Sequence, residues 1–75
     1  MRMENLNCLF VGDLPRSCTE KDLIQMLSPY GPIEDLLLKH NSTVPYAFVT
    51  MGSREAGEEA IRSLNGTTFL GRLIR

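Results

Sequence analysis

The sequence has few of the residues from which catalytic and metal sites are usually built. It contains one histidine and two cysteines among 75 residues. Cys8 and Cys18 lack the close spacing of a metal-ligand pair, and two cysteines are too few for a disulfide scaffold. One histidine and two isolated thiols supply no nucleophile–base pair. We therefore expect no enzyme, no metal site and no cofactor.

Long hydrophobic runs are also missing. No apolar segment approaches the roughly 18 residues that a bilayer-spanning helix needs, and the first residues lack the apolar segment of a secretory leader. We expect no membrane association, reduced thiols, and a nuclear or cytoplasmic location. The hydrophobic content of 43% argues against disorder, and the length of 75 residues suits a single domain.

An excess of positive charge is the third absence. Eight basic residues against nine acidic ones give a net charge of −1, whereas nucleic-acid-binding domains are usually basic. The segments predicted to be helices are slightly acidic, and the rest of the chain is slightly basic. If this chain binds nucleic acid, electrostatic attraction must therefore be a minor contribution.

The first half of the chain predicts a strand, a helix and a second strand. Residues 9–11 are β-favouring and are closed by a turn signal at residues 12–15. Thr19 can cap the helix that follows. That helix has an apolar stripe at helical spacing and ends at residues 29–32, which contain two prolines and a glycine. Residues 33–39 are predicted to be a strand because they lie between this stop and a polar loop.

The second half predicts the same order of a strand, a helix and a strand. Residues 46–51 are aromatic and β-branched, and Ser53 is a second N-cap candidate before another apolar stripe. Asn65 and Gly66 give a helix stop, and residues 69–75 are predicted to be the last strand, reached through a turn at Leu70 and Gly71. The order β-α-β-β-α-β with right-handed crossovers predicts an α/β (α+β) ferredoxin-like sandwich. Its four-stranded antiparallel sheet would have both helices packed on one face.

Side-chain alternation divides the predicted strands into two faces. Small aliphatic side chains suit the face under the helices, which leaves Phe10, Tyr46 and Phe48 on the open face. Exposed aromatic rings on adjacent strands need a cover, and stacking of a nucleic-acid base on such a ring contributes about 1–3 kcal/mol. The predicted core is Leu9, Val11, Leu23, Met26, Leu27, Ile33, Leu36, Leu38, Ala47, Val49, Met51, Ala60, Ile61, Leu64 and Ile74.

Two segments on these strands resemble the motifs of the RNA-recognition-motif family. Residues 9–14 (Leu-Phe-Val-Gly-Asp-Leu) look like its shorter RNP motif, and residues 44–51 (Val-Pro-Tyr-Ala-Phe-Val-Thr-Met) look like its longer octapeptide. The resemblance extends over residues 8–75. It implies that Phe10 and Tyr46 each stack on a base of single-stranded RNA and that Phe48 contacts the sugars between them.

The sequence departs from the family's pattern at three positions. The octapeptide usually begins with a basic residue that pairs with phosphate, followed by glycine, but Val44 and Pro45 stand in these places. Asp13 stands where asparagine is common. Because one charge-assisted phosphate contact is missing, we expect lower affinity than in members that keep it.

Further candidates surround the aromatic residues. Lys39, Arg72 and Arg75 flank the predicted sheet and could meet phosphates, and Leu37 is predicted to lie on the open face. Ile24, beside the apolar stripe of the first helix, is the candidate contact for a protein partner. The predicted RNA-binding residues are therefore Phe10, Leu37, Lys39, Tyr46, Phe48, Arg72 and Arg75.

Two other functions remain to be weighed. The first alternative is a protein-interaction module of the same fold within a larger RNA-processing protein, in which a protein or a further segment covers the aromatic face. The second is an enzyme such as the acylphosphatases, which share the element order but need an arginine-bearing phosphate loop that residues 12–16 resemble only faintly. For the domain organisation we expect one monomeric domain of this family, residues 1–75 with its core in residues 8–75, from a longer protein and with its last strand cut short at the C-terminus.

Overall fold

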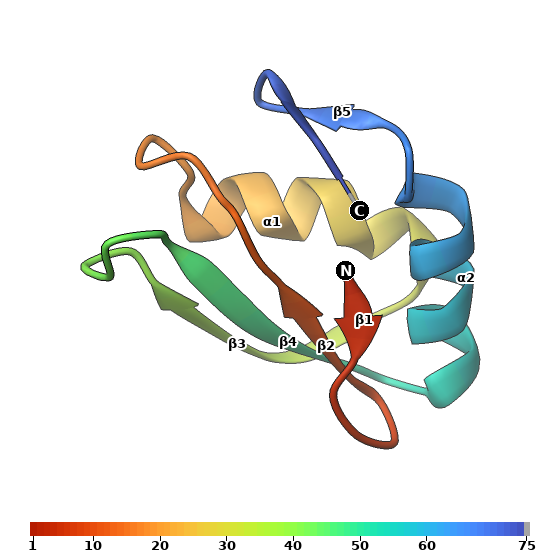
Figure 1. The fold of residues 1–75 in the computed structure, drawn as a ribbon. Coiled ribbons are helices and arrows are strands. Elements are labelled where there is room, and N and C mark those ends of the chain that lie inside the picture. The colour runs from red at the N-terminus through yellow and green to blue at the C-terminus, as the bar shows by residue number, and fades with distance from the viewer. Residues whose placement is uncertain (75) are drawn as a thin grey trace.

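A computed structural model describes residues 1–74 as a four-stranded antiparallel sheet with two helices on one of its faces (Figure 1). The strands of the sheet lie in the spatial order β1-β2-β4-β3, and a separate two-stranded hairpin pairs β5 with β6. In chain order the elements are β1 (Arg2–Met3), β2 (Cys8–Val11), α1 (Glu20–Leu27), the 3₁₀ turn η1 (Ser28–Tyr30), β3 (Ile33–Lys39), β4 (Tyr46–Met51), α2 (Arg54–Leu64), β5 (Thr68–Phe69) and β6 (Arg72–Leu73).

Both helices begin at the capping residues that the sequence predicts. The Thr19 hydroxyl accepts a hydrogen bond from the Asp22 backbone N–H at 3.2 Å, and the Asp22 carboxylate accepts one from the Thr19 N–H at 2.9 Å. This reciprocal pair satisfies two donors that a helix start leaves unpaired. Ser53 caps α2 by accepting from the Ala56 N–H at 3.1 Å. The predicted N-terminal ends of both helices are confirmed.

The core lies between the sheet and the two helices, as the alternation predicts. Every predicted core residue is buried or packed partly buried against the buried cluster. The observed core also contains four buried residues that are absent from the predicted core: Met1, Leu14, Cys18 and Ala56. No helix among residues 1–74 is long and apolar enough to cross a membrane.

The fourth strand of the sheet is not the one that the sequence predicts. The sequence predicts that residues 69–75 complete the sheet, but the N-terminal strand β1 pairs with β2 instead, with Arg2 opposite Phe10 and Met3 opposite Leu9. The C-terminal segment instead folds back on itself, with Thr68 opposite Leu73. Arg75 lies outside the described residues.

The backbone at Leu70 and Gly71 explains this difference. Their φ angles are +51° and +83°, and positive φ at both central residues is the geometry of the tight type I′ hairpin turn. Such a turn reverses the chain within two residues, so β6 pairs with β5. The turn is predicted correctly from the sequence, whereas the strand that follows it was assigned to the wrong sheet.

The N-terminal strand is anchored on the helical side of the sheet. Met3 packs against the buried core, and its sulfur lies 3.1 Å from the place where a Cβ at Gly57 of α2 would be. The loop that joins β1 to β2 is tied to the end of β4, because the Asn7 side chain donates to the Met51 carbonyl at 2.7 Å and the Met51 N–H donates to the Asn7 carbonyl at 2.9 Å. These contacts hold Arg2 beside Phe10.

Candidate nucleic-acid interface

The face of the sheet opposite the helices carries a cluster of three aromatic rings. Phe10 comes from β2, and Tyr46 and Phe48 come from β4, on the face that alternation predicts. The ring centroids lie 5.9 Å apart for Phe10 and Tyr46, 5.6 Å for Phe10 and Phe48, and 5.8 Å for Tyr46 and Phe48. All three residues are half-buried, so the rings shelter one another's edges and keep part of their surface accessible.

A single cross-strand row runs through this cluster over all four strands. Arg2 is opposite Phe10, Phe10 is opposite Phe48, and Phe48 is opposite Leu37. Directly opposite residues of antiparallel strands point to the same face, so all four side chains lie on the open face. Leu37 is 48% exposed there, as its alternation with Leu36 and Leu38 predicts.

Gly12 shapes the position of the Phe10 ring. A Cβ at residue 12 would lie 2.7 Å from Cε2 of Phe10, closer than carbon atoms can approach. The Phe10 ring therefore lies along β2 and covers Gly12, the next residue on the same face. This space exists only because position 12 carries no side chain.

The cations predicted to meet phosphate occupy two different settings. Lys39 is exposed and pairs in register with Tyr46, so it borders the aromatic cluster at the β3 edge. Arg72 lies on the hairpin rather than on the sheet, where its guanidinium donates to the Asp13 carboxylate at 2.7 Å. A phosphate at Arg72 would have to compete with this pair. Arg75 is not among the described residues.

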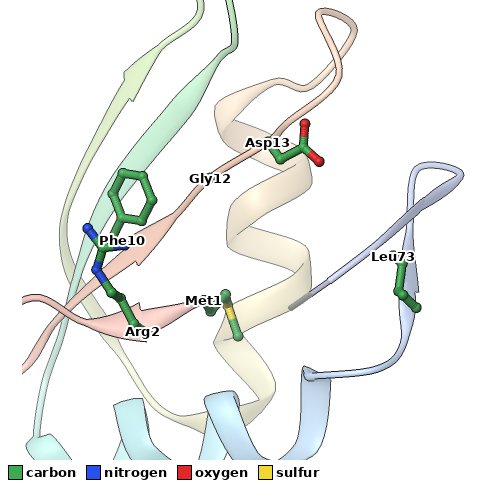
Figure 2. Close-up of a pocket in the computed structure, with 6 residues that line it drawn as sticks. All are labelled: Met1, Arg2, Phe10, Gly12, Asp13 and Leu73. Atoms are coloured by element: carbon green, nitrogen blue, oxygen red, sulfur yellow. The ribbon is translucent and has the colours of Figure 1, made fainter.

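A hollow lies at the β1 side of the cluster (Figure 2). Its volume is about 410 Å³, and its lining residues are Met1, Arg2, Phe10, Gly12, Asp13 and Leu73. Small-molecule sites in proteins usually measure about 300–1,000 Å³. This hollow is therefore large enough to take part in binding a nucleotide next to Phe10.

The structure places Cys18 and the single histidine, His40, on the lining of one hollow. Residues 1–74 contain no group of three histidine, cysteine or acidic side chains that could hold a metal ion. Cys18 is buried, and burial, together with the negative charge of Asp22, raises the pKa of its thiol. Since the thiolate is the reactive form, this environment lowers the reactivity of the Cys18 thiol.

Sequence reasoning missed Arg2, whose guanidinium carbon lies 4.4 Å from the centroid of the Phe10 ring. A strand of two residues is too short to show alternation, so no periodic signal marks it. The cue that the sequence does hold is the pair Asn5 and Asn7, with Glu4, between Met3 and the next apolar run, because such residues favour a reversal of the chain.

A four-stranded sheet with an open aromatic face and two helices behind it defines a class of small nucleic-acid-binding domain. Comparison with protein families makes the assignment specific, because the model of the RNA recognition motif matches residues 9–75. The chain belongs to the RNA-recognition-motif family.

Relatives and solved structures agree with this assignment. Polyadenylate-binding protein RBP45 of Nicotiana plumbaginifolia is 37% identical over 71 residues, a match that covers 95% of this chain and 17% of that protein. Human cleavage stimulation factor subunit 2 is 32% identical over 75 residues, covering 95% and 13%. The first two RRM domains of the yeast poly(U)-binding protein Pub1 superimpose with a TM-score of 0.80 at 30% identity, covering 91% of this chain and 42% of that one. The chain thus spans less than a fifth of these curated relatives.

Proposed function

We propose that this domain binds short single-stranded RNA by stacking bases on the open aromatic face. In this proposal Phe10 and Tyr46 each carry one base, and Phe48 contacts the sugars between them. The observation that carries the proposal is the mutual contact of the three rings across the two central strands, with Phe10 directly opposite Phe48 and Tyr46 two residues along β4. Flat apolar rings that remain half-exposed in water gain stability when bases cover them.

The relatives support RNA as the ligand. They include a polyadenylate-binding protein and an mRNA-processing factor. A solved Sxl-lethal protein–RNA complex matches this chain with a TM-score of 0.75 at 28% identity, covering the whole of this chain and 51% of that one. The relatives also include a chloroplastic ribonucleoprotein, so a nuclear or cytoplasmic location stays a prediction.

Lys39 and Leu37 complete the proposed binding face at the β3 edge. Lys39 would contact a phosphate beside the base on Tyr46, and Leu37 would contact a base or sugar beside Phe48. Arg72 and Arg75 remain proposed contacts outside the sheet. Because few cations are available, stacking supplies most of the affinity, and we expect a salt slope of about −1.5 to −3 from roughly two to four phosphate contacts.

We further propose that the domain is a monomeric binding module and not an enzyme. Cys18 and the single loop histidine, His40, line one hollow, but Cys18 is buried and burial raises the pKa of its thiol, which disfavours the thiolate that a cysteine nucleophile needs. A protein partner, if the parent protein has one, would meet α1 at Ile24, which is 44% exposed on the side of the domain away from the aromatic face.

Titration of the isotope-labelled domain with RNA homopolymers six to eight bases long tests this function. We expect the amide signals of residues 10, 46 and 48, with their neighbours on β2 and β4, to shift most, and those of α1 and α2 to stay unchanged. Shifts confined to the helices, or an absence of binding to every homopolymer and to a random-sequence pool, would contradict the proposal.

A further inference from the structure

We propose that Arg2 is an RNA-contacting residue that caps the base stacked on Phe10, so that the base lies between an aromatic ring and a guanidinium group. This inference rests on the proposed function and adds to it a residue from a strand that the sequence does not reveal. It assigns β1 a role in binding, in addition to its role as the fourth strand.

The position of Arg2 is the first observation that supports this role. Its guanidinium carbon lies 4.4 Å from the centroid of the Phe10 ring, within the range of a cation–π contact. Figure 2 shows both side chains on the same side of the sheet beside the hollow. The register of β1 fixes this arrangement, because Arg2 is directly opposite Phe10.

The weak restraint on Arg2 is the second observation. Its other partner is Glu4, at 3.4 Å between Nε and Oε2, and the side chains are 66% and 39% exposed. Exposed ion pairs of this kind contribute about 0–1 kcal/mol. The guanidinium can therefore lift from Phe10 at little cost to admit a base, and then stack on the outer side of that base.

The chemistry of a guanidinium suits this position. Its planar, delocalised cation stacks on the π-face of a base and also donates hydrogen bonds to phosphate. Val44 leaves the octapeptide without its usual cation, and the described residues place few other basic groups on the aromatic face. Arg2 supplies a positive charge at the opposite edge of that face from Lys39, next to a hollow of about 410 Å³ that can take the adjoining nucleotide.

The test compares two arginine-to-alanine variants of the full chain. Arg2→Ala removes the proposed cap. Arg54→Ala removes an arginine of α2 that forms an equally long ion pair, 3.4 Å from Glu58, and that is similarly exposed at 57%. The two variants have the same net charge. Any affinity tag follows Arg75, because Met1 is buried. Preserved amide signals of Met3 and Leu9 show that β1 still pairs.

We expect Arg2→Ala to raise the Kd for the homopolymer that the parent binds most tightly by about three- to tenfold and to reduce the salt slope by about 0.7. Arg54→Ala should stay within about twofold of the parent, since α2 lies across the domain from the sheet face. Arg2→Lys should keep the salt slope but recover only part of the affinity, because lysine retains the charge without the planar group. In a Phe10→Ala background, removing Arg2 should have a smaller effect, because the base that it caps is already lost.

Two outcomes would overturn the proposal. Equal binding by Arg2→Ala and Arg54→Ala would show that Arg2 is a bystander, and tighter binding by Arg2→Ala would show that it obstructs Phe10. In either case Phe10→Ala decides the fate of the proposed function separately. If Phe10→Ala weakens binding, RNA stacking stands and only the role of Arg2 is wrong. If Phe10→Ala binds as the parent does, both proposals are wrong.

Discussion

The ring of Phe10 lies over the backbone of Gly12, where a Cβ would meet Cε2 at 2.7 Å and Cζ at 3.1 Å. Gly12 has no positive φ angle, so its backbone conformation is open to any residue. Glycine is therefore required at position 12 because it leaves space for the Phe10 ring. A substitution there is expected to change RNA binding more than the stability of the fold.

Gly12→Ala should displace the Phe10 ring and weaken RNA binding by about 1–2 kcal/mol, part of the stacking contribution of one base. Thermal unfolding should change little, because alanine is compatible with this backbone. Fluorescence anisotropy with a labelled oligonucleotide measures the affinity. A double-mutant cycle with Phe10→Ala provides the control, because the effect of Gly12→Ala should vanish once the ring is gone.

Phe10→Ala and Tyr46→Ala should each weaken RNA binding by about 1–3 kcal/mol. Each also removes ring–ring contacts within the cluster, which contribute about 0.5–1.5 kcal/mol per pair, so a modest loss of stability is expected without unfolding. Ile24→Ala on α1 is the matched control and should leave RNA affinity unchanged. Two folded aromatic variants with the parent's affinity would show that the sheet face binds something other than RNA.

Val44→Arg should tighten binding and steepen the salt slope by about 0.7, the contribution of one phosphate contact on a single strand. Val44 is 51% exposed just before β4, so a longer side chain meets no core atom. The slope comes from Kd values measured at several salt concentrations between about 50 and 300 mM. Screening of exposed charges is already substantial at about 100 mM, within this range. Val44→Gln, similar in length but uncharged, should leave the slope unaltered; an equal gain from glutamine would assign the effect to contact area instead of charge.

Leu27→Ala should destabilise the domain by about 2–5 kcal/mol, a large share of the stability of a small protein. Leu27 is fully buried in the core, whereas Ile24 of the same helix is 44% exposed. Ile24→Ala should therefore cost less than about 0.5 kcal/mol, typical of a surface substitution. Chemical denaturation of the two variants compares them, and similar losses would mean that α1 packs with a different face toward the sheet.

The parts of the fold that sequence reasoning predicts correctly depend on local signals. Thr19 and Ser53 cap helices through their own side chains, and the division of β2 and β4 into two faces follows from alternation over four to six residues. The aromatic cluster was predictable for the same reason. Its three members lie on adjacent strands, and pairing of Phe10 with Phe48 brings them together.

The parts that were missed depend on the direction in which the chain leaves a turn, which the turn signals at residues 12–15 and 70–71 do not specify. Leu70 and Asp13 adopt positive φ angles of +51° and +55° although neither is glycine. The first sends the C-terminal segment into its own hairpin. The second lies in the turn after β2 that directs Leu14 into the core, where the Leu14 N–H donates to the Pro45 carbonyl at 2.9 Å. Arg2 was missed because its strand exists only through pairing with β2.

The short β1 strand also limits backbone pairing between this sheet and other protein chains. An unpaired outer strand offers its backbone to neighbouring molecules, and charges and irregularities protect against such aggregation. The β3 edge has both, since it carries Glu34, Asp35 and Lys39 and its register shifts between residues 33 and 35. The β2 strand, Cys-Leu-Phe-Val, has neither. By pairing with β2, Arg2 and Met3 therefore cover a strand whose exposure would favour self-association, and they place a charged arginine at that edge.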